Sequence, residues 1–126
     1  MKWLLLVGLL RVGATSCETP TAMQGGVWLD PVPAEYADDW RSVEACSGLT
    51  GDFATVRWVI YPDRLVVPGT RNLGQAHHDT RIIELGGRAL APIRRHEILH
   101  LLLGPVGDDH PVAYFVDRCG TLVSHD

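Results

Sequence analysis

The chain has 126 residues, of which 46% are hydrophobic and 21% are charged, and these values fit one small globular domain with a modest core. Its formal net charge is −4 and its single lysine is Lys2. This acidic balance argues against nucleic acid as a partner. We also expect the protein to be a monomer.

Residues 1–16 have the organisation of a signal peptide. Lys2 precedes a short apolar run at 3–10, and small residues end the segment. The run is too short to span a membrane. Cys17 follows directly, as in a bacterial lipobox, in which the cysteine carries a lipid; simple secretion after cleavage at the same bond is the alternative. Both predict a protein exported to the cell envelope or secreted, with a membrane attachment only through lipid at Cys17.

Residues 17–32 resemble a flexible tether because proline and glycine interrupt the segment. The folded domain is therefore expected to cover residues 33–126. Its first helix is predicted at 33–46, where Pro33 suits the start and large apolar residues repeat at helical spacing, namely Tyr36, Trp40 and Val43.

The cysteine count predicts a disulfide. If Cys17 is lipidated or lies in the tether, Cys46 and Cys119 remain as a pair. An exported domain of this size gains from such a bond, because closing so long a loop contributes a few kcal/mol. Two free thiols are the alternative.

Two segments have the pattern of strands. Residues 53–61 alternate between apolar and polar side chains, and residues 80–85 alternate in part. The apolar run at 65–67 is a candidate hairpin partner for the first strand. Residues 71–78 are polar and predict a solvated loop, in which the adjacent His77 and His78 point in different directions; a place at the rim of a cleft is the alternative.

The strongest signal is His96-Glu97-Ile98-Leu99-His100, the pattern H-E-x-x-H. Pro92 and the pair Gly104-Pro105 predict that it lies on a helix between them. Histidines four residues apart fall about 40° apart on one helix face. Both can therefore bind one metal ion, and Glu97 beside them can hold a metal-bound water.

This helix is apolar on nearly all sides, which is typical of a buried helix. Unpaired polar groups in such a place cost several kcal/mol, and a bound metal would account for two histidines and a glutamate there. The alternative is a core helix without metal, whose histidines form hydrogen bonds to their neighbours.

The pattern His96-Glu97-x-x-His100 on a hydrophobic helix resembles the zincin metallopeptidases, over roughly residues 92–119. The resemblance implies one Zn²⁺ ion held by His96 and His100, with Glu97 as the general base. It also implies a peptide or protein substrate, and an edge strand that binds the substrate backbone, for which either predicted strand could serve.

A catalytic zinc usually has three protein ligands. Val106 stands where the metzincin branch has its third histidine, and no glutamate follows Glu97, which excludes the gluzincin pattern. His110 follows a Gly-Pro-Val-Gly turn that can bring the chain back to the helix. We predict His110 as the third ligand, with Asp108 or Asp109 as the alternative.

Residues 111–118 predict a short helix, in which Val112 and Phe115 pack on the metal-binding helix. Tyr114 lies four residues beyond His110. Its hydroxyl is a candidate catalytic group that would stabilise the oxyanion of a tetrahedral intermediate. The alternative is a half-buried packing residue.

Together these expectations describe a small α+β domain of zincin type, with a mostly antiparallel sheet packed against an N-terminal helix and a buried H-E-x-x-H helix. The predicted function is that of a zinc metallopeptidase, in which metal-activated water hydrolyses a peptide or amide bond. The alternative is a non-catalytic zinc-binding surface lipoprotein, although such a protein would not require Glu97.

Overall fold

The computed structural model describes residues 25–121. The predicted signal peptide, Cys17 and the first part of the predicted tether lie outside this range. The described elements follow in the order β1 (Val27–Trp28), α1 (Ala34–Ser47), η1 (Phe53–Thr55), β2 (Arg57–Tyr61), β3 (Gly74–His77), β4 (Ile82–Gly86), α2 (Ala91–Leu103), η2 (Gly104–Gly107) and η3 (Ala113–Arg118).

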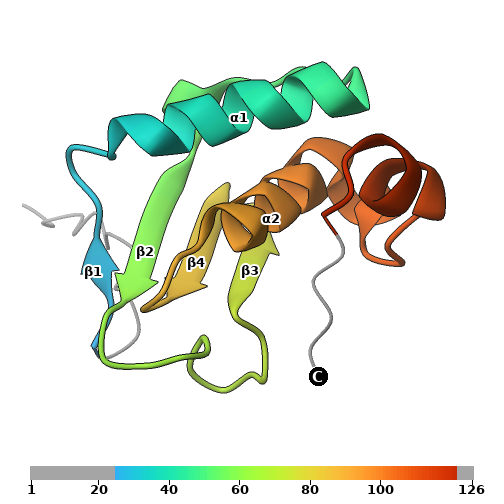
Figure 1. Ribbon diagram of the computed structural model, residues 1–126. Coiled ribbons are helices and arrows are strands. Elements are labelled where there is room, and N and C mark those ends of the chain that lie inside the picture. The colour runs from blue at the N-terminus through green and yellow to red at the C-terminus, as the bar shows by residue number, and fades with distance from the viewer. Residues whose placement is uncertain (1–24, 122–126) are drawn as a thin grey trace, which may run out of the picture.

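One sheet of four strands carries the two long helices on a single face (Figure 1). The strand order is β1-β2-β4-β3, and two of the three pairings are antiparallel, while β2 and β4 are parallel. The predicted α+β class with a mostly antiparallel sheet is therefore confirmed. Because β3 pairs only with β4 within residues 25–121, it is an edge strand of the described sheet.

Both long helices begin and end within a residue or two of the predicted positions. In α1, the side chains of Tyr36, Trp40 and Val43 are buried, as their spacing predicted. In α2, apolar residues are buried on both sides of the histidines. No helix within residues 25–121 has the length and apolar character needed to cross a membrane.

The main core lies between the helices and the sheet, where Trp58, Ile83 and Leu85 meet both helices. A second, smaller cluster covers the other face of the sheet around Val59, Tyr61 and Val67. Burial of both faces explains why β2 has an almost continuous apolar sequence instead of a simple alternation.

The strands predicted at 53–61 and 80–85 are confirmed as β2 and β4 with shifted bounds, whereas other predictions of extended or irregular structure were wrong. The strand predicted at 53–61 begins only at residue 57, because 53–55 form a 3₁₀ turn whose Ala54 N–H is capped by the Asp52 side chain. Residues 65–67 form no strand; Val67 instead packs under the sheet. The region predicted as a loop, 71–78, contains β3.

The described end of the predicted tether also belongs to the fold. Val27 and Trp28 form β1 and pair with Ile60 and Val59 of β2. Two paired residues are too short a strand for a pattern of alternation to predict, so the boundary at residue 32 was set too late.

The predicted disulfide between Cys46 and Cys119 is confirmed. It joins the end of α1 to the residue that follows η3, across a sequence separation of 73 residues. A hydrogen bond of 2.9 Å from Arg118 Nη1 to the Ser47 carbonyl joins the same two segments. The last residue of η3 and the residue after it are thus both tied to the end of α1.

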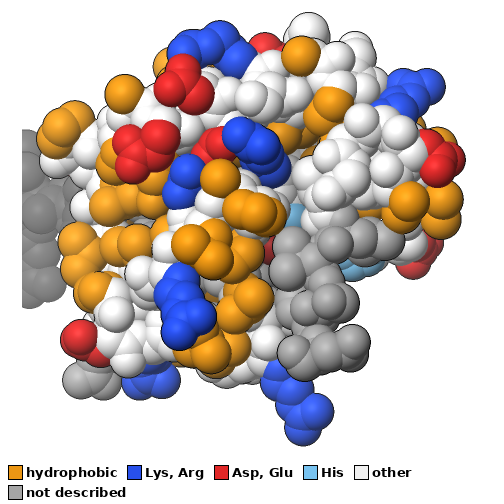
Figure 2. All heavy atoms as spheres, in the orientation of Figure 1, with side chains coloured by type: hydrophobic (Ala, Val, Ile, Leu, Met, Phe, Trp, Pro, Cys, Tyr) orange, Lys and Arg blue, Asp and Glu red, His pale blue; other side chains and the backbone are white. Residues whose placement is uncertain are grey.

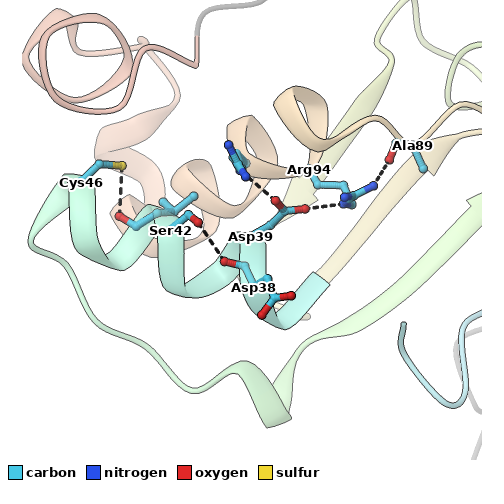
Figure 3. A network of polar contacts seen from close by, with 8 residues as sticks. Asp38, Asp39, Ser42, Cys46, Ala89 and Arg94 are labelled. Carbon is cyan, nitrogen blue, oxygen red and sulfur yellow. Dashed lines mark hydrogen bonds and ion pairs between the residues drawn. The ribbon is translucent and has the colours of Figure 1, made fainter. Parts of the chain in front are cut away.

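A buried ion pair holds α1 against α2 (Figure 3). Asp39 is 3% exposed, and its two carboxylate oxygens accept hydrogen bonds of 2.6 and 2.8 Å from the Nε atoms of Arg94 and Arg95. The Arg94 guanidinium also lies over the Tyr36 ring and donates to the Ala89 carbonyl. Figure 2 shows acidic and basic side chains side by side over these two helices.

Replacement of Asp39 by alanine should lower the free energy of unfolding by about 3 kcal/mol, because it leaves the largely buried Arg94 without its charge partner. Urea denaturation of the oxidised protein measures this change. The matched control is Asp38→Ala, next in the chain, whose ion pair with Arg41 is exposed and should contribute less than about 0.5 kcal/mol. Equal losses in the two variants would contradict a buried role for Asp39.

Candidate metal site

Three histidine side chains converge at the C-terminal half of α2. The Nε2 atoms of His96, His100 and His110 lie 3.0–3.1 Å from one another. This is close enough for all three to bind one metal ion. His96 is buried and the other two are half-buried, so the cluster is shielded from water on the side of the core.

Helix geometry and a tight turn bring the three residues together. His96 and His100 share one face of α2, as their spacing predicted. The chain then folds back through η2, where a Cβ on Gly107 would lie 2.9 Å from the Cβ of Leu103. Only glycine permits this close approach, and it allows His110 to return to the helix. The prediction of His110 as a member of the cluster agrees with this geometry.

A backbone carbonyl orients His96. The Nδ1 atom of His96 lies 2.8 Å from the carbonyl oxygen of Thr121. Because a carbonyl oxygen only accepts, Nδ1 must donate, and in a neutral ring this leaves a lone pair on Nε2. Thr121 is held in turn by a 2.7 Å hydrogen bond from its N–H to the carbonyl of Phe115. Sequence reasoning missed this contact because a backbone carbonyl has no sequence signature.

The ring of Phe115 forms an apolar floor beneath the cluster. It is fully buried, and its centroid lies 5.1, 4.8 and 4.9 Å from the ring centroids of His96, His100 and His110. The prediction that Phe115 packs on the metal-binding helix is therefore confirmed. The same prediction for Val112 was wrong, since Val112 is 60% exposed.

The environment keeps His100 neutral. Burial, together with the positive charge that His96 and His110 carry when protonated, lowers the pKa of His100 to about 4. At neutral pH the imidazole is thus uncharged, which is the form that binds metal ions.

Glu97 lies beside the cluster and against β3. It is 6% exposed, and a Cβ on Gly74 would lie 2.7 Å from its Cγ, so a residue without a side chain is needed there. Burial raises the pKa of Glu97 to about 8, while a hydrogen bond from the Ala76 N–H acts in the opposite direction. A dication at the three imidazoles would also lower this pKa.

The histidines and Glu97 line a common cleft of about 230 Å³. The remainder of the lining comes from the edge strand β3, from the residues before it and from the loop before His110, namely Asn72, Gly74, Gln75, Ala76 and Asp108. The cleft is therefore bounded by α2, which carries His96 and His100, on one side and by the edge strand β3 on the other.

Neither alternative third ligand joins the cluster. Asp108 instead accepts a hydrogen bond of 2.9 Å from His78 Nε2, which lowers the pKa of the Asp108 carboxyl, and Asp109 is exposed. His77, the neighbour of His78, contacts Glu84 on the other face of the sheet. The prediction that the two histidines point in different directions is confirmed. The prediction that they lie in a solvated loop was wrong, because His77 belongs to β3.

The structure does not bring Tyr114 into the cleft. The lining residues do not include it, and its half-buried ring lies 4.7 Å from the Arg118 guanidinium. The packing alternative therefore describes Tyr114 better than the oxyanion role.

Comparison of the chain with family models, with curated proteins and with solved structures found no match.

Replacement of His110 by alanine should weaken metal binding more than about 100-fold, because it removes one of the three converging nitrogens. Loss of a ligand should lower the affinity more than loss of a residue that only orients a ligand, which costs about 10–100-fold. Competition with a chromophoric chelator, with Zn²⁺ as the probe ion, measures the affinity. Asp109→Ala changes the adjacent exposed residue, and its Zn²⁺ affinity should stay within about threefold of that of the wild type. An Asp109→Ala loss as large as that of His110→Ala would identify Asp109 as a ligand.

Removal of the disulfide should weaken both the fold and the metal site. A Cys46→Ser, Cys119→Ser variant loses the cross-link over 73 residues, worth about 4 kcal/mol of unfolding free energy. Metal affinity should also fall, by about tenfold, because Cys119 anchors the segment whose Thr121 carbonyl orients His96. Denaturation and metal titration measure the two effects. Unchanged affinity in the folded variant would show that Thr121 stays in place without the cross-link.

Proposed function

We propose that this protein is a zinc-dependent metallopeptidase. The observation that carries the proposal is the buried carboxylate of Glu97, which lines the same cleft as three converging imidazole nitrogens. The resemblance of His96-Glu97-x-x-His100 to the zincins supports the same function, and the metal, the reaction and the family are all parts of the proposal.

The donor set fits zinc. Zinc binds imidazole nitrogen at about 2.0–2.1 Å in tetrahedral sites, which separates neighbouring ligand nitrogens by about 3.3 Å. The observed separations of 3.0–3.1 Å are within about 0.3 Å of this value. Three histidines also leave a fourth position, which is typical of catalytic and not of structural zinc sites.

When bound, zinc would supply a Lewis acid that lowers the pKa of water and polarises a carbonyl group. The protein would supply the proton transfer. Glu97 lies in the cleft with its carboxylate shielded from bulk water, where it can accept a proton from the attacking water and later deliver it to the leaving amine. His96 would be kept in the correct tautomer by the Thr121 carbonyl.

The edge strand β3 provides a means of binding a peptide. In the described part of the chain it pairs with β4 on one side only, and it lines the cleft through Gly74, Gln75 and Ala76. An extended peptide can add to such an edge through main-chain hydrogen bonds, which would place its backbone beside the histidines. We therefore propose β3, and not the central strand β2, as the substrate-binding strand.

Export is part of the proposal. The Cys46–Cys119 disulfide supports it weakly, because such bonds persist in oxidising compartments. The predicted signal peptide and the possible lipid at Cys17 lie outside the described residues and stay predictions.

Replacement of Glu97 by glutamine should lower turnover by about 10²–10⁴-fold, because it removes the general base, while zinc stoichiometry stays at one ion per chain. Hydrolysis of a fluorogenic peptide library and metal analysis measure the two quantities. Glu35→Gln, at an exposed position on α1, is the matched control. A wild type that binds zinc but cleaves no peptide, with Glu97→Gln indistinguishable from it, would favour the non-catalytic zinc-binding lipoprotein instead.

A further inference from the structure

The third histidine of the cluster lies on the least supported segment of the site. His96 and His100 are part of α2, whereas His110 follows a short 3₁₀ turn and an exposed Asp109. The backbone hydrogen bonds from the N–H groups of Asp108 and His110 reach only to Pro105 and Gly107, within the same turn.

The backbone of His110 is also strained. Its φ angle is +51°, in the left-handed region that residues with a side chain seldom adopt. Such a conformation persists only when surrounding contacts hold it. Besides the contacts of the His110 ring with His96, His100 and Phe115, a contact to the segment before His110 would help to keep this backbone conformation.

A long-range side-chain hydrogen bond holds the segment before His110 in this way. His78 Nε2 lies 2.9 Å from Asp108 Oδ1, across a sequence separation of 30 residues. Because an ionised carboxylate only accepts, the imidazole donates. Asp108 is two residues before His110 and lines the cleft, so this hydrogen bond joins the end of β3 to the segment that carries the third nitrogen.

The other end of this contact is firmly anchored. His78 directly follows His77, whose Nε2 lies 2.7 Å from Glu84 Oε2 on β4. Glu84 also accepts a 2.6 Å hydrogen bond from the buried Tyr61 hydroxyl on β2. The two adjacent histidines thus connect the sheet to the His110 segment, one on each side of β3.

We propose that His78 and Asp108 act as positioning residues, which clamp the segment before His110 so that its imidazole stays at the metal site. The clamp is defined as the His78–Asp108 hydrogen bond. The inference rests on the metal site of the proposed function but needs no catalytic activity.

The test is zinc affinity of the full-length, disulfide-bonded protein, measured by competition with a chromophoric chelator. His78→Ala and Asp108→Ala should each weaken binding about tenfold, as is typical when outer-shell partners of metal ligands are lost. The double variant should be no weaker than either single variant, because both remove the same interaction. Asp109→Ala, at the exposed neighbour, should bind as the wild type does.

Asp108→Asn separates the clamp from simple charge attraction or direct ligation. Its amide oxygen still accepts a hydrogen bond from His78, so affinity should recover to within about threefold of the wild type. If Asp108 acted through its charge or as a ligand, Asp108→Asn would be as weak as Asp108→Ala, and the clamp would be wrong.

Absorption of the Co²⁺-substituted proteins gives a readout that general destabilisation would not move. The wild type, Asp109→Ala and Asp108→Asn should share one spectrum, and His78→Ala and Asp108→Ala should share another, with weaker bands. If His78→Ala fails to fold, as judged by circular dichroism, the Asp108 variants decide, because that side chain is 65% exposed.

The outcomes also separate this inference from the proposed function. A wild type that binds zinc and cleaves no peptide refutes the peptidase and leaves the clamp intact. Zinc binding that His78→Ala leaves unchanged refutes the clamp alone. A folded wild type that binds no zinc refutes both.

Discussion

Three imidazoles whose Nε2 atoms converge are the physical constraint around which the described structure is built. Their Nε2 atoms lie 3.0–3.1 Å apart, and at this spacing two protonated rings would repel each other strongly. Burial against Phe115 and the neighbouring histidines keep the pKa of His100 near 4. The three Nε2 atoms are therefore close enough to bind one cation, which would hold them together through coordination.

Each of the three rings depends on a contact from a different part of the chain. The Thr121 carbonyl orients His96, helix packing over Phe115 holds His100, and the turn at η2 returns His110. The Cys46–Cys119 disulfide holds the Thr121 segment close to α1. The buried Asp39 ion pairs hold α1 against α2. Stability of the fold and geometry of the cluster are thus coupled, because the same contacts serve both.

The features that the sequence predicted correctly depend on local spacing or on simple counting. The periodicities of α1 and α2, the histidine spacing and the even pair of cysteines are of this kind. The strand β3 was missed because Gly74 lacks a side chain for a tertiary reason, namely the close approach of Glu97. Sequence spacing also left Asp108 and Asp109 as alternatives to His110 for the third ligand. Only the path of the chain after η2 shows that His110 is the residue that joins the cluster.

Glu97 is the residue at which stability and function are opposed. Its burial carries a cost, which is visible in a pKa raised to about 8, and the edge strand must place a glycine, Gly74, where the side chain lies. A site that only retained a metal ion would gain nothing from this arrangement, since three imidazoles already supply the ligands. A site that moves protons beside the metal requires a carboxyl group within reach of water and shielded from bulk solvent. The cost of burying Glu97 therefore supports hydrolysis over storage as the proposed function.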